Sequence, residues 1–404
     1  MNKNLLRRAE RGFSLVEMMI AMTIGLMICA GLVTIFANTS NTQQELRRTA
    51  QQIENGRYAM DVLSQDVQLT GYFGAFRKLV PPTTTAPDPC SLTVDSTNPA
   101  DTSSINYSIN LPVQAYNAPS LSAWPTLPAS CAAYLPTSNL AIGSDVVVIR
   151  RSDTQYVPIG TATAAGTVYG QANPSAIDIH LGGGTTTCVS RADGSTAPVV
   201  HTDGTSWAVL TRRLQYPATT DICNGTASPA GYIRQIHVHI YFVAPCNIPS
   251  SGSLCDLAAD GGKPIPTLKR LELTATGGAP AFKTVNIAEG IEYLKLGYGI
   301  DDTPTAVNSD TGLVGDGSPD RYSLAPSLAD MTNIVTARID MLVRNPEPSA
   351  GYTDTKTYAL GVDPTVNTNP AVTIPAASLD STYRRHVYSA EIRLVNLSSR
   401  KEIP

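Results

Sequence analysis

The chain begins with an apolar stretch and continues with a periodic one, and together they predict a long helix. Residues 13–36 are apolar apart from Ser14, Glu17, glycines and threonines, which is enough to cross about 30 Å of hydrocarbon as a helix. No proline occurs between Asn38 and Gly74. We therefore predict one unbroken helical stem from about residue 13 to residue 70, ending near Gly71.

The outer half of this predicted stem carries an apolar stripe. Its members recur at spacings of seven, seven, three and four residues, which places them on one face of a helix: Leu46, Ile53, Met60, Leu63 and Val67. We expect this face to pack on the rest of the protein, while the fully apolar first half lies in a membrane.

Beyond the stem the pattern changes to strand-like runs separated by turn-forming residues. The runs are 145–150, 206–210, 233–243, 268–274, 291–300, 334–343 and 386–395. A Pro-, Thr- and Ser-rich stretch at about 80–140 is typical of a loop-rich insertion. Because no helices alternate with the strands and no repeat is visible, the prediction is an α+β protein: a helical stem followed by an antiparallel, β-rich globular head.

The charges around the apolar run predict its direction in the membrane. Four basic residues precede it, namely Lys3, Arg7, Arg8 and Arg11, so the positive-inside rule keeps the N-terminus cytoplasmic and sends the rest outward. The run is longer than the core of an ordinary secretory signal, and Ile35-Phe36-Ala37 is a poor cleavage site. A lipoprotein signal is excluded because bulky residues precede Cys29. A plain membrane anchor explains neither Glu17 nor the Gly12-Phe13 junction.

The cysteines indicate the same compartment. Of seven, Cys29 lies in the apolar run and six lie beyond it: Cys90, Cys131, Cys188, Cys223, Cys246 and Cys255. No CxxC pair or zinc-like spacing occurs, so up to three disulfides in an oxidising compartment are predicted, with buried free thiols as the alternative. Pairing of neighbours (Cys90–Cys131, Cys188–Cys223, Cys246–Cys255) is the simplest connectivity, although the sequence cannot choose among the fifteen possibilities.

The junction Gly12-Phe13-Ser14-Leu15-Val16-Glu17 resembles the signal of type IV pilins and type II secretion pseudopilins. A basic leader, a glycine, an aromatic start, a glutamate at the fifth position and an apolar run match together. The resemblance implies that prepilin peptidase removes residues 1–12 and N-methylates Phe13. It also divides the stem into a transmembrane or filament-core part at 13–36 and an amphipathic part at 37–71, with the head at 72–404.

The resemblance gives Glu17 a role. A carboxylate within a membrane costs about 2.5–3.5 kcal/mol on insertion scales, so it is expected to mark function and to have a partner. In pilins that partner is the amino terminus of a neighbouring subunit. The alternative is that Glu17 reaches the nearby cytoplasmic interface.

Further motifs narrow the resemblance to PilW-type minor pilins. In the stem, Glu54-Asn55-Gly56-Arg57-Tyr58-Ala59 is followed by Asp61, Leu63, Asp66 and Gly71-Tyr72, as in that family. Blocks at 266–270, 298–301, 337–344, 384–389 and 393–396 are also similar. The resemblance therefore covers the stem and several strands, but not the loops at about 81–140.

The family implies a pilus assembly protein that joins other minor pilins, the major pilin and a tip adhesin in a priming complex at the tip of the pilus, or fimbrium. Twitching motility and cell adhesion are the implied outputs. It also implies an inner-membrane protein with one span and a periplasmic head, which later reaches the pilus at the cell surface. The alternatives are a J-type pseudopilin of a type II secretion system and an adhesin whose head binds surfaces directly.

Little in the head indicates catalysis. His237 and His239 alternate in a strand-like run and offer two nitrogens on one side, but no third ligand has a matching spacing, so paired histidines on a solvated face are favoured. No nucleophile, base and orienting group can be assembled, and we predict no enzyme. A net charge of −4 without a basic stripe argues against nucleic-acid binding.

An acidic, glycine-rich segment at 299–322 is a stronger candidate ion site than the histidine pair. Its oxygen donors are of the type that calcium prefers: Asp301, Asp302, Asp310, Asp316 and Asp320. Asp316-Gly317 and Asp320-Arg321-Tyr322 resemble half of an acidic loop in PilW-type relatives, but an insertion after Asp302 breaks the spacing. Ca²⁺ is therefore weighed against a solvated surface turn, and no other cofactor is predicted.

Overall fold

The computed structural model describes most of the chain. The described residues are 14–80, 82–95, 98, 101–158, 161–174, 177–187, 199–201, 206–207, 232–248, 255, 264–302, 315–361 and 372–401. The chain divides into two compact units, Met1–Gln51 and Gln52–Pro404, which are described separately below.

Helix α1 (Leu15–Gln68) is the stem expected from the sequence. It has 54 residues and, at about 1.5 Å per residue, a length of about 80 Å. It ends where expected, because Gly71 has a φ of 74°, a left-handed conformation that glycine adopts without steric cost.

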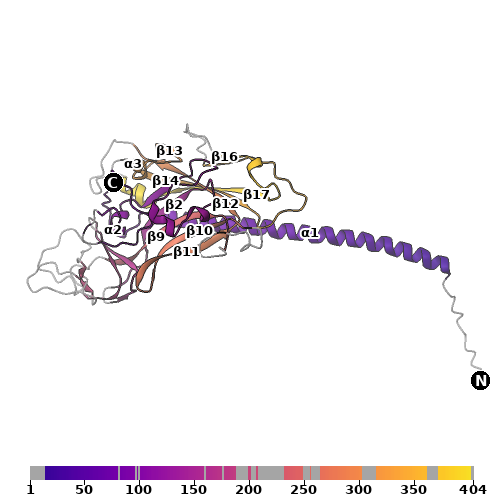
Figure 1. The fold of residues 1–404 in the computed structure, drawn as a ribbon, viewed down its shortest axis with the longest axis horizontal. Helices are drawn as coiled ribbons and strands as arrows, with labels where there is room; N and C mark the ends of the chain where they lie inside the picture. Colours follow the sequence, from indigo (N-terminus) through magenta and orange to yellow (C-terminus); the bar gives the residue numbers. More distant parts are fainter. Residues whose placement is uncertain are drawn as a thin grey trace, which may run out of the picture. The chain divides into compact units, whose positions relative to one another are not determined.

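The head is built on antiparallel sheets. Among the described residues the largest has seven strands, with a main path β1-β2-β9-β10-β11 and with β4 joining β9 to β5. Figure 1 shows β9, β10 and β11 side by side. The bounds are β1 Val113–Tyr116, β2 Val146–Ser152, β4 Val168–Ala172, β5 Ile177–Leu181, β9 Ile233–Ala244, β10 Thr267–Thr276 and β11 Ala279–Glu289.

A second sheet has four described strands in the order β13-β12-β14-β17. They are β12 Ile291–Ile300, β13 Arg321–Ser323, β14 Ile334–Arg344 and β17 Arg385–Arg393. Small sheets pair β15 (Tyr358–Leu360) with β16 (Val372–Ile374), and join β3 (Ala162–Thr163), β6 (Gly184–Thr187), β7 (Val199–His201) and β8 (Ser206–Trp207). The short helices are α2 Ile105–Ser108, α3 Leu328–Met331 and α4 Val395–Lys401, with 3₁₀ turns at Ala129–Ala133, Thr137–Asn139 and Ala376–Ser378.

Two hydrophobic cores lie on opposite faces of the large sheet, as strand β9 shows. Tyr241 and Val243 belong to the core shared with the second sheet and with α1. Ile240 and Phe242 face the other core. Alternate residues of a strand point to opposite sides, so the second half of β9, from Ile240 to Ala244, is continuously apolar because both of its faces are buried there.

The insertion at about 80–140 is loop-rich, as expected, since its described residues form only α2, β1 and two 3₁₀ turns, but it packs on the second of these faces. It contains strand β1, which pairs with β2, and it contributes buried Cys90, Ile105, Cys131 and Leu135 to the second core. Its Pro-rich composition concealed this packing, because many of these contacts are made by irregular backbone and short turns.

Most predicted strands are present, and the main omission is β11. The hairpin joining β10 to β11 turns at Gly277 and Gly278, whose φ angles are 61° and 81°. Two adjacent glycines with positive φ suit a tight hairpin turn, so this pair was the signal that could have revealed β11. The strand predicted at 386–395 extended too far, since Val395 begins helix α4. Of the strand predicted at 206–210, only Ser206 and Trp207 are described.

Candidate functional site

The start of the stem carries the first part of the site. Gly12 and Phe13 lie outside the described residues. Glu17 is in the first turn of α1, where its Oε2 accepts a hydrogen bond from the backbone N–H of Ser14 at 3.0 Å. The carboxylate thus satisfies a free amide at a helix N-terminus, the end at which the helix dipole favours negative charge.

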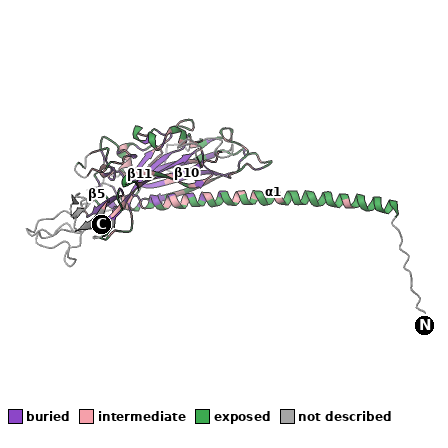
Figure 2. Cartoon of the chain, turned by 60° about the horizontal axis from the view of Figure 1, so that its bottom comes forward, coloured by how far each residue is buried: buried purple, intermediate pink, exposed green. Residues whose placement is uncertain are grey.

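The apolar first part of α1 has no partner within the described chain. An 18-residue window has a mean hydropathy of 2.3 and none of it is buried, so by length and composition the helix can cross a membrane. Figure 2 shows this part of α1 as exposed along almost its whole length. Cys29, which is a free thiol, is exposed here too.

The second part of α1 is packed in the head, on a face that overlaps the predicted stripe only in part. The buried residues are Gln52, Gly56, Ala59, Leu63, Asp66 and Val67. Leu63 and Val67 were predicted correctly and Met60 is partly buried, but Ile53 and Leu46 are 41% and 65% exposed. The stripe was misplaced because the contact uses small and hydrogen-bonded polar residues, which an apolar pattern does not detect.

Polar groups hold the first turns of this packed segment, from Gln52 to Gly56, against the head. Gln52 Nε2 donates to the carbonyl oxygens of Val343 (2.7 Å) and Arg384 (3.1 Å), and Asn55 Nδ2 donates to that of Glu289 (3.1 Å). A Cβ on Gly56 would lie 2.4 Å from the ring of Tyr388. The Asn-Gly pair of the stem motif therefore allows close approach and supplies a hydrogen bond.

Asp66, near the C-terminal end of α1, is the centre of a buried polar cluster. Its Oδ1 accepts from Arg151 Nε at 2.7 Å, and its Oδ2 accepts from Tyr241 Oη at 2.8 Å and from His239 Nδ1. His237 lies beside His239, with ring centroids 5.5 Å apart, and its Nε2 is 3.6 Å from Asp153. The prediction of a solvated histidine face was wrong, because α1 covers this side of β9.

The surroundings of the cluster change the pKa values of Asp66 and His237. Burial raises the pKa of the Asp66 carboxyl, but the hydrogen bond and charge of His239 and the charge of Arg151 outweigh it, so that the pKa lies below its usual range. Burial, followed by the charges of His239 and Arg151, lowers the pKa of His237 to about 4. Near neutral pH, His237 is thus uncharged, whereas the Asp66 carboxyl is ionised.

Sequence reasoning missed this cluster, although a signal was present. Asp66 follows Ala59 and Leu63 at helical spacing, and so occupies an otherwise apolar face. His239 and Tyr241 alternate on one side of β9, a spacing that marks a shared face but not what covers it.

Helix α4 holds the end of the stem from the other end of the chain. Asn396 Nδ2 donates to the carbonyl oxygens of Gln68 (3.2 Å) and Thr70 (3.3 Å). Arg400 Nη2 donates to those of Gly71 and Phe76, both at 2.9 Å. The contact with Gln68 satisfies one of the free carbonyl groups at the end of α1, and the other contacts hold the segment that follows it.

The four described aspartates of the acidic loop each have protein partners. Asp301 Oδ2 accepts from the N–H of Gly317 at 2.8 Å, and Asp320 Oδ2 from that of Asp302 at 2.8 Å. Asp316 Oδ1 accepts from the N–H of Ser318 at 2.8 Å, and Asp302 pairs with Arg321. They do not converge as one compact ligand set within the described chain. Asp310 lies outside the described residues, and calcium binding stays a prediction.

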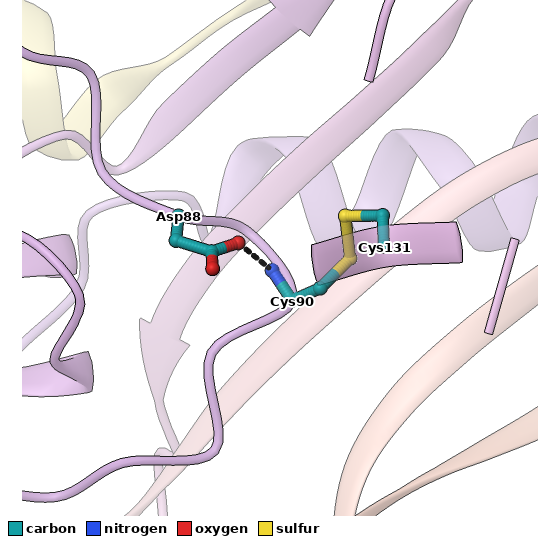
Figure 3. A group of neighbouring side chains, drawn as sticks. All are labelled: Asp88, Cys90 and Cys131. Carbon is teal, nitrogen blue, oxygen red and sulfur yellow. Dashed lines mark hydrogen bonds between the residues drawn. A yellow bond between two sulfur atoms is a disulfide. The ribbon is translucent and has the colours of Figure 1, made fainter. Parts of the chain in front are cut away.

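Two disulfides connect four of the six predicted cysteines: Cys90–Cys131 and Cys246–Cys255. Cys188 and Cys223 lie outside the described residues. Asp88 lies beside the first disulfide, and its Oδ1 accepts from the N–H of Cys90 at 2.9 Å (Figure 3). Because both sulfurs are joined to each other, this grouping ties the insertion together and offers no thiolate pair to a metal.

Family comparisons match both ends of the chain. The Prokaryotic N-terminal methylation motif matches residues 7–33. The family described as Type IV Pilus-assembly protein W, PilW, matches residues 257–396, which include β10, β11, β12, β14 and β17. The chain is a PilW-type minor pilin of the type IV pilus. As a minor pilin it takes part in pilus assembly, contacts other pilus components and carries the motif for prepilin processing.

Other comparisons add little to this assignment. No curated protein matches the minor pilin. The type IV-like pilin TTHA1219 from Thermus thermophilus is similar at 11% identity, over 40% of this chain and 78% of that one, with a TM-score of 0.17. The family points to a structural role and not an enzymatic one, and the motif with its apolar helix fits a pilin anchored in the inner membrane before it enters the pilus.

Proposed function

We propose that this minor pilin primes pilus assembly in a tip complex with other minor pilins and a tip adhesin. The observation that carries the proposal is the apolar first part of α1, which contains a membrane-length window with no buried residue. An apolar surface of this size needs the membrane first and the helices of other subunits afterwards. The second part of the same helix packs in the head through its buried residues from Gln52 to Val67.

In this proposal, prepilin peptidase cuts after Gly12 and methylates Phe13. The new amino terminus then lies four residues before Glu17, whose carboxylate is already at the N-terminal turn of α1. Glu17 accepts the amino terminus of a neighbouring subunit, which neutralises both charges and sets the axial register as the subunit leaves the membrane.

The head lies in the periplasm before assembly. Two disulfides support this placement, because disulfides persist in the oxidising periplasm and are rare in the cytosol. The basic residues before the apolar run support the same orientation by the positive-inside rule.

The test compares two glutamates of one helix. Glu17→Ala and, as a matched control, the exposed Glu54→Ala are expressed in a strain lacking the native copy. Processing in membranes and the amount in sheared pili are followed by immunoblotting. Both variants should be processed, but Glu17→Ala should be depleted from the pili while Glu54→Ala resembles the native chain.

Normal incorporation of Glu17→Ala would remove the assigned role of this carboxylate. Co-purification of other minor pilins with the full chain supports the tip complex. Loss of protein secretion with unchanged pilus number upon deletion would instead favour the J-type pseudopilin, and glycan or surface binding by the purified chain would favour the adhesin.

A further inference from the structure

The acidic loop contains a cation supplied by the chain itself. Lys401, the last residue of α4, is 2% exposed. Its Nζ donates to the carbonyl oxygen of Asp301 at 3.0 Å and to Asn333 Oδ1 at 2.8 Å, and it lies 3.8 Å from Asp301 Oδ2. A backbone carbonyl, a side-chain amide and a carboxylate therefore surround one buried ammonium.

These donors are the oxygen types that hold calcium in proteins. Asp301 is 1% exposed, and its Oδ1 is a buried acceptor without a hydrogen-bond partner among the described residues. Burial lowers the pKa of the Lys401 ammonium, while the negative charges of Asp301, Asp302 and Asp320 oppose this effect. Three carboxylates thus act on a single buried positive charge.

A second cation, Arg321, lies at the outer edge of the acidic loop. Arg321 pairs with Asp302 and Asp330, and its side chain is 43% exposed. It screens the outer edge of the loop, whereas Lys401 is buried against Asp301. Removing the ammonium would leave a buried carboxylate without a counter-charge, which is a costly arrangement in a protein interior.

We propose that Lys401 is a tethered cation which occupies a latent calcium site and makes the acidic loop independent of metal. While the ammonium is in place, an incoming Ca²⁺ would have to displace it or lie beside a like charge. When the ammonium is removed, the same oxygens and solvent can coordinate Ca²⁺. The proposal concerns the stability of the head and does not rest on the role of the protein in assembly.

The test measures the melting temperature of the full-length chain in detergent, with EDTA, with Ca²⁺ and with Mg²⁺, each at about 1 mM, the range of weak extracellular calcium sites. The native chain should melt at the same temperature in all three. Lys401→Ala should melt lower in EDTA and recover part of the loss with Ca²⁺ but not with Mg²⁺. The exposed Lys283→Ala should respond to neither ion.

Lys401→Gln, which keeps a polar side chain without the charge, gives a second version in case Lys401→Ala does not fold. Lys401→Arg retains a cation and should show no calcium response. A calcium-dependent rise for the native chain, or no response from either uncharged variant, would overturn the proposal. If both uncharged variants fold only with Ca²⁺, the proposal is supported in its strongest form.

Discussion

The two parts of helix α1 are continuous in backbone but meet different surroundings. The membrane-length window in the first part has no buried residue, and its side chains are almost all apolar. The second part buries a glycine, an alanine, a glutamine and an aspartate beside only two larger apolar residues. Lipid or a bundle of other helices requires apolarity along the helix, whereas a docking surface on a folded head requires matching shape and satisfied polar groups.

The difference has an energetic consequence. Many changes in the first part should leave the head stable, because the head does not depend on their side-chain shapes. Changes at the packed face should weaken the head strongly, since buried polar groups lose their partners there. Pairs of matched substitutions in the two parts, or on the two faces, therefore test the comparison directly.

The largest effect is expected at Asp66. Asp66→Ala removes the carboxylate on which Arg151, His239 and Tyr241 converge, so it should lower the free energy of unfolding by about 3–5 kcal/mol. The control is Asp61→Ala, five residues earlier, which removes an exposed side chain that accepts a hydrogen bond from Gln65. This change should alter the free energy of unfolding by less than about 0.5 kcal/mol. Urea unfolding of the full-length chain in detergent measures both, and equal losses would contradict the buried position of Asp66.

The second-largest expected effect is a pH dependence of the free energy of unfolding, which is caused by His237. Its pKa is about 4 in the folded protein and about 6.5 when unfolded, so between these values the unfolded state binds the extra proton. Stability should therefore fall as the pH drops from about 6.5 to 4, by up to about 3 kcal/mol. The groups facing His237 are His239, Arg151 and Asp153.

Asp66 contributes at lower pH. Its stabilising ionised form is present above its unfolded pKa of about 3.9, and that contribution is lost as the pH falls toward its depressed folded pKa. Urea unfolding at a series of pH values should give a flatter profile between about pH 6.5 and 4 for His237→Gln. The exposed His386→Gln should keep the native slope, and a native slope in His237→Gln would remove this explanation.

A smaller effect is expected at Gly56. A leucine there meets the ring of Tyr388 and should reduce stability by about 1–3 kcal/mol through overpacking. Gly25→Leu is the control, since no atom lies within 4 Å of a Cβ at that position, and the head should unfold as in the native chain. Adding Tyr388→Ala to Gly56→Leu should recover part of the loss, which a double-mutant cycle of unfolding free energies would measure. Independent, additive effects would show that the two residues do not touch.

The sequence predicted the stem and its processing motif because these depend on local features. Apolarity over a membrane length, the absence of proline and a glycine at the end are read directly from the chain, and α1 follows them. The central strands were also predictable, since β9, β12 and β14 are buried along most of their length. By contrast, α4 has only seven residues and a weak pattern, so nothing local indicated that it would close on the end of the stem.

The candidate sites also divide into those that local sequence reveals and those that depend on residues far apart in the chain. The motif at Gly12, Phe13 and Glu17 could be located from spacing, because the peptide bond proposed to be cut and the carboxylate lie close together along the chain. The cluster at Asp66 could not, since Arg151 and His239 join it from strands 85 and 173 residues away. Likewise the acidic loop suggested an ion, but its cation is Lys401, 100 residues from Asp301.

The sequence alone thus determined where the chain is apolar enough for a membrane, where the mature protein is expected to begin and which strands form the core of the head. Only the tertiary structure decided which face of the stem is buried, that α1 covers the histidines of β9, and that Lys401 contacts Asp301 of the acidic loop. The physical reason is that apolarity and chain length act locally, whereas hydrogen bonds between buried charges depend on groups brought together by the fold.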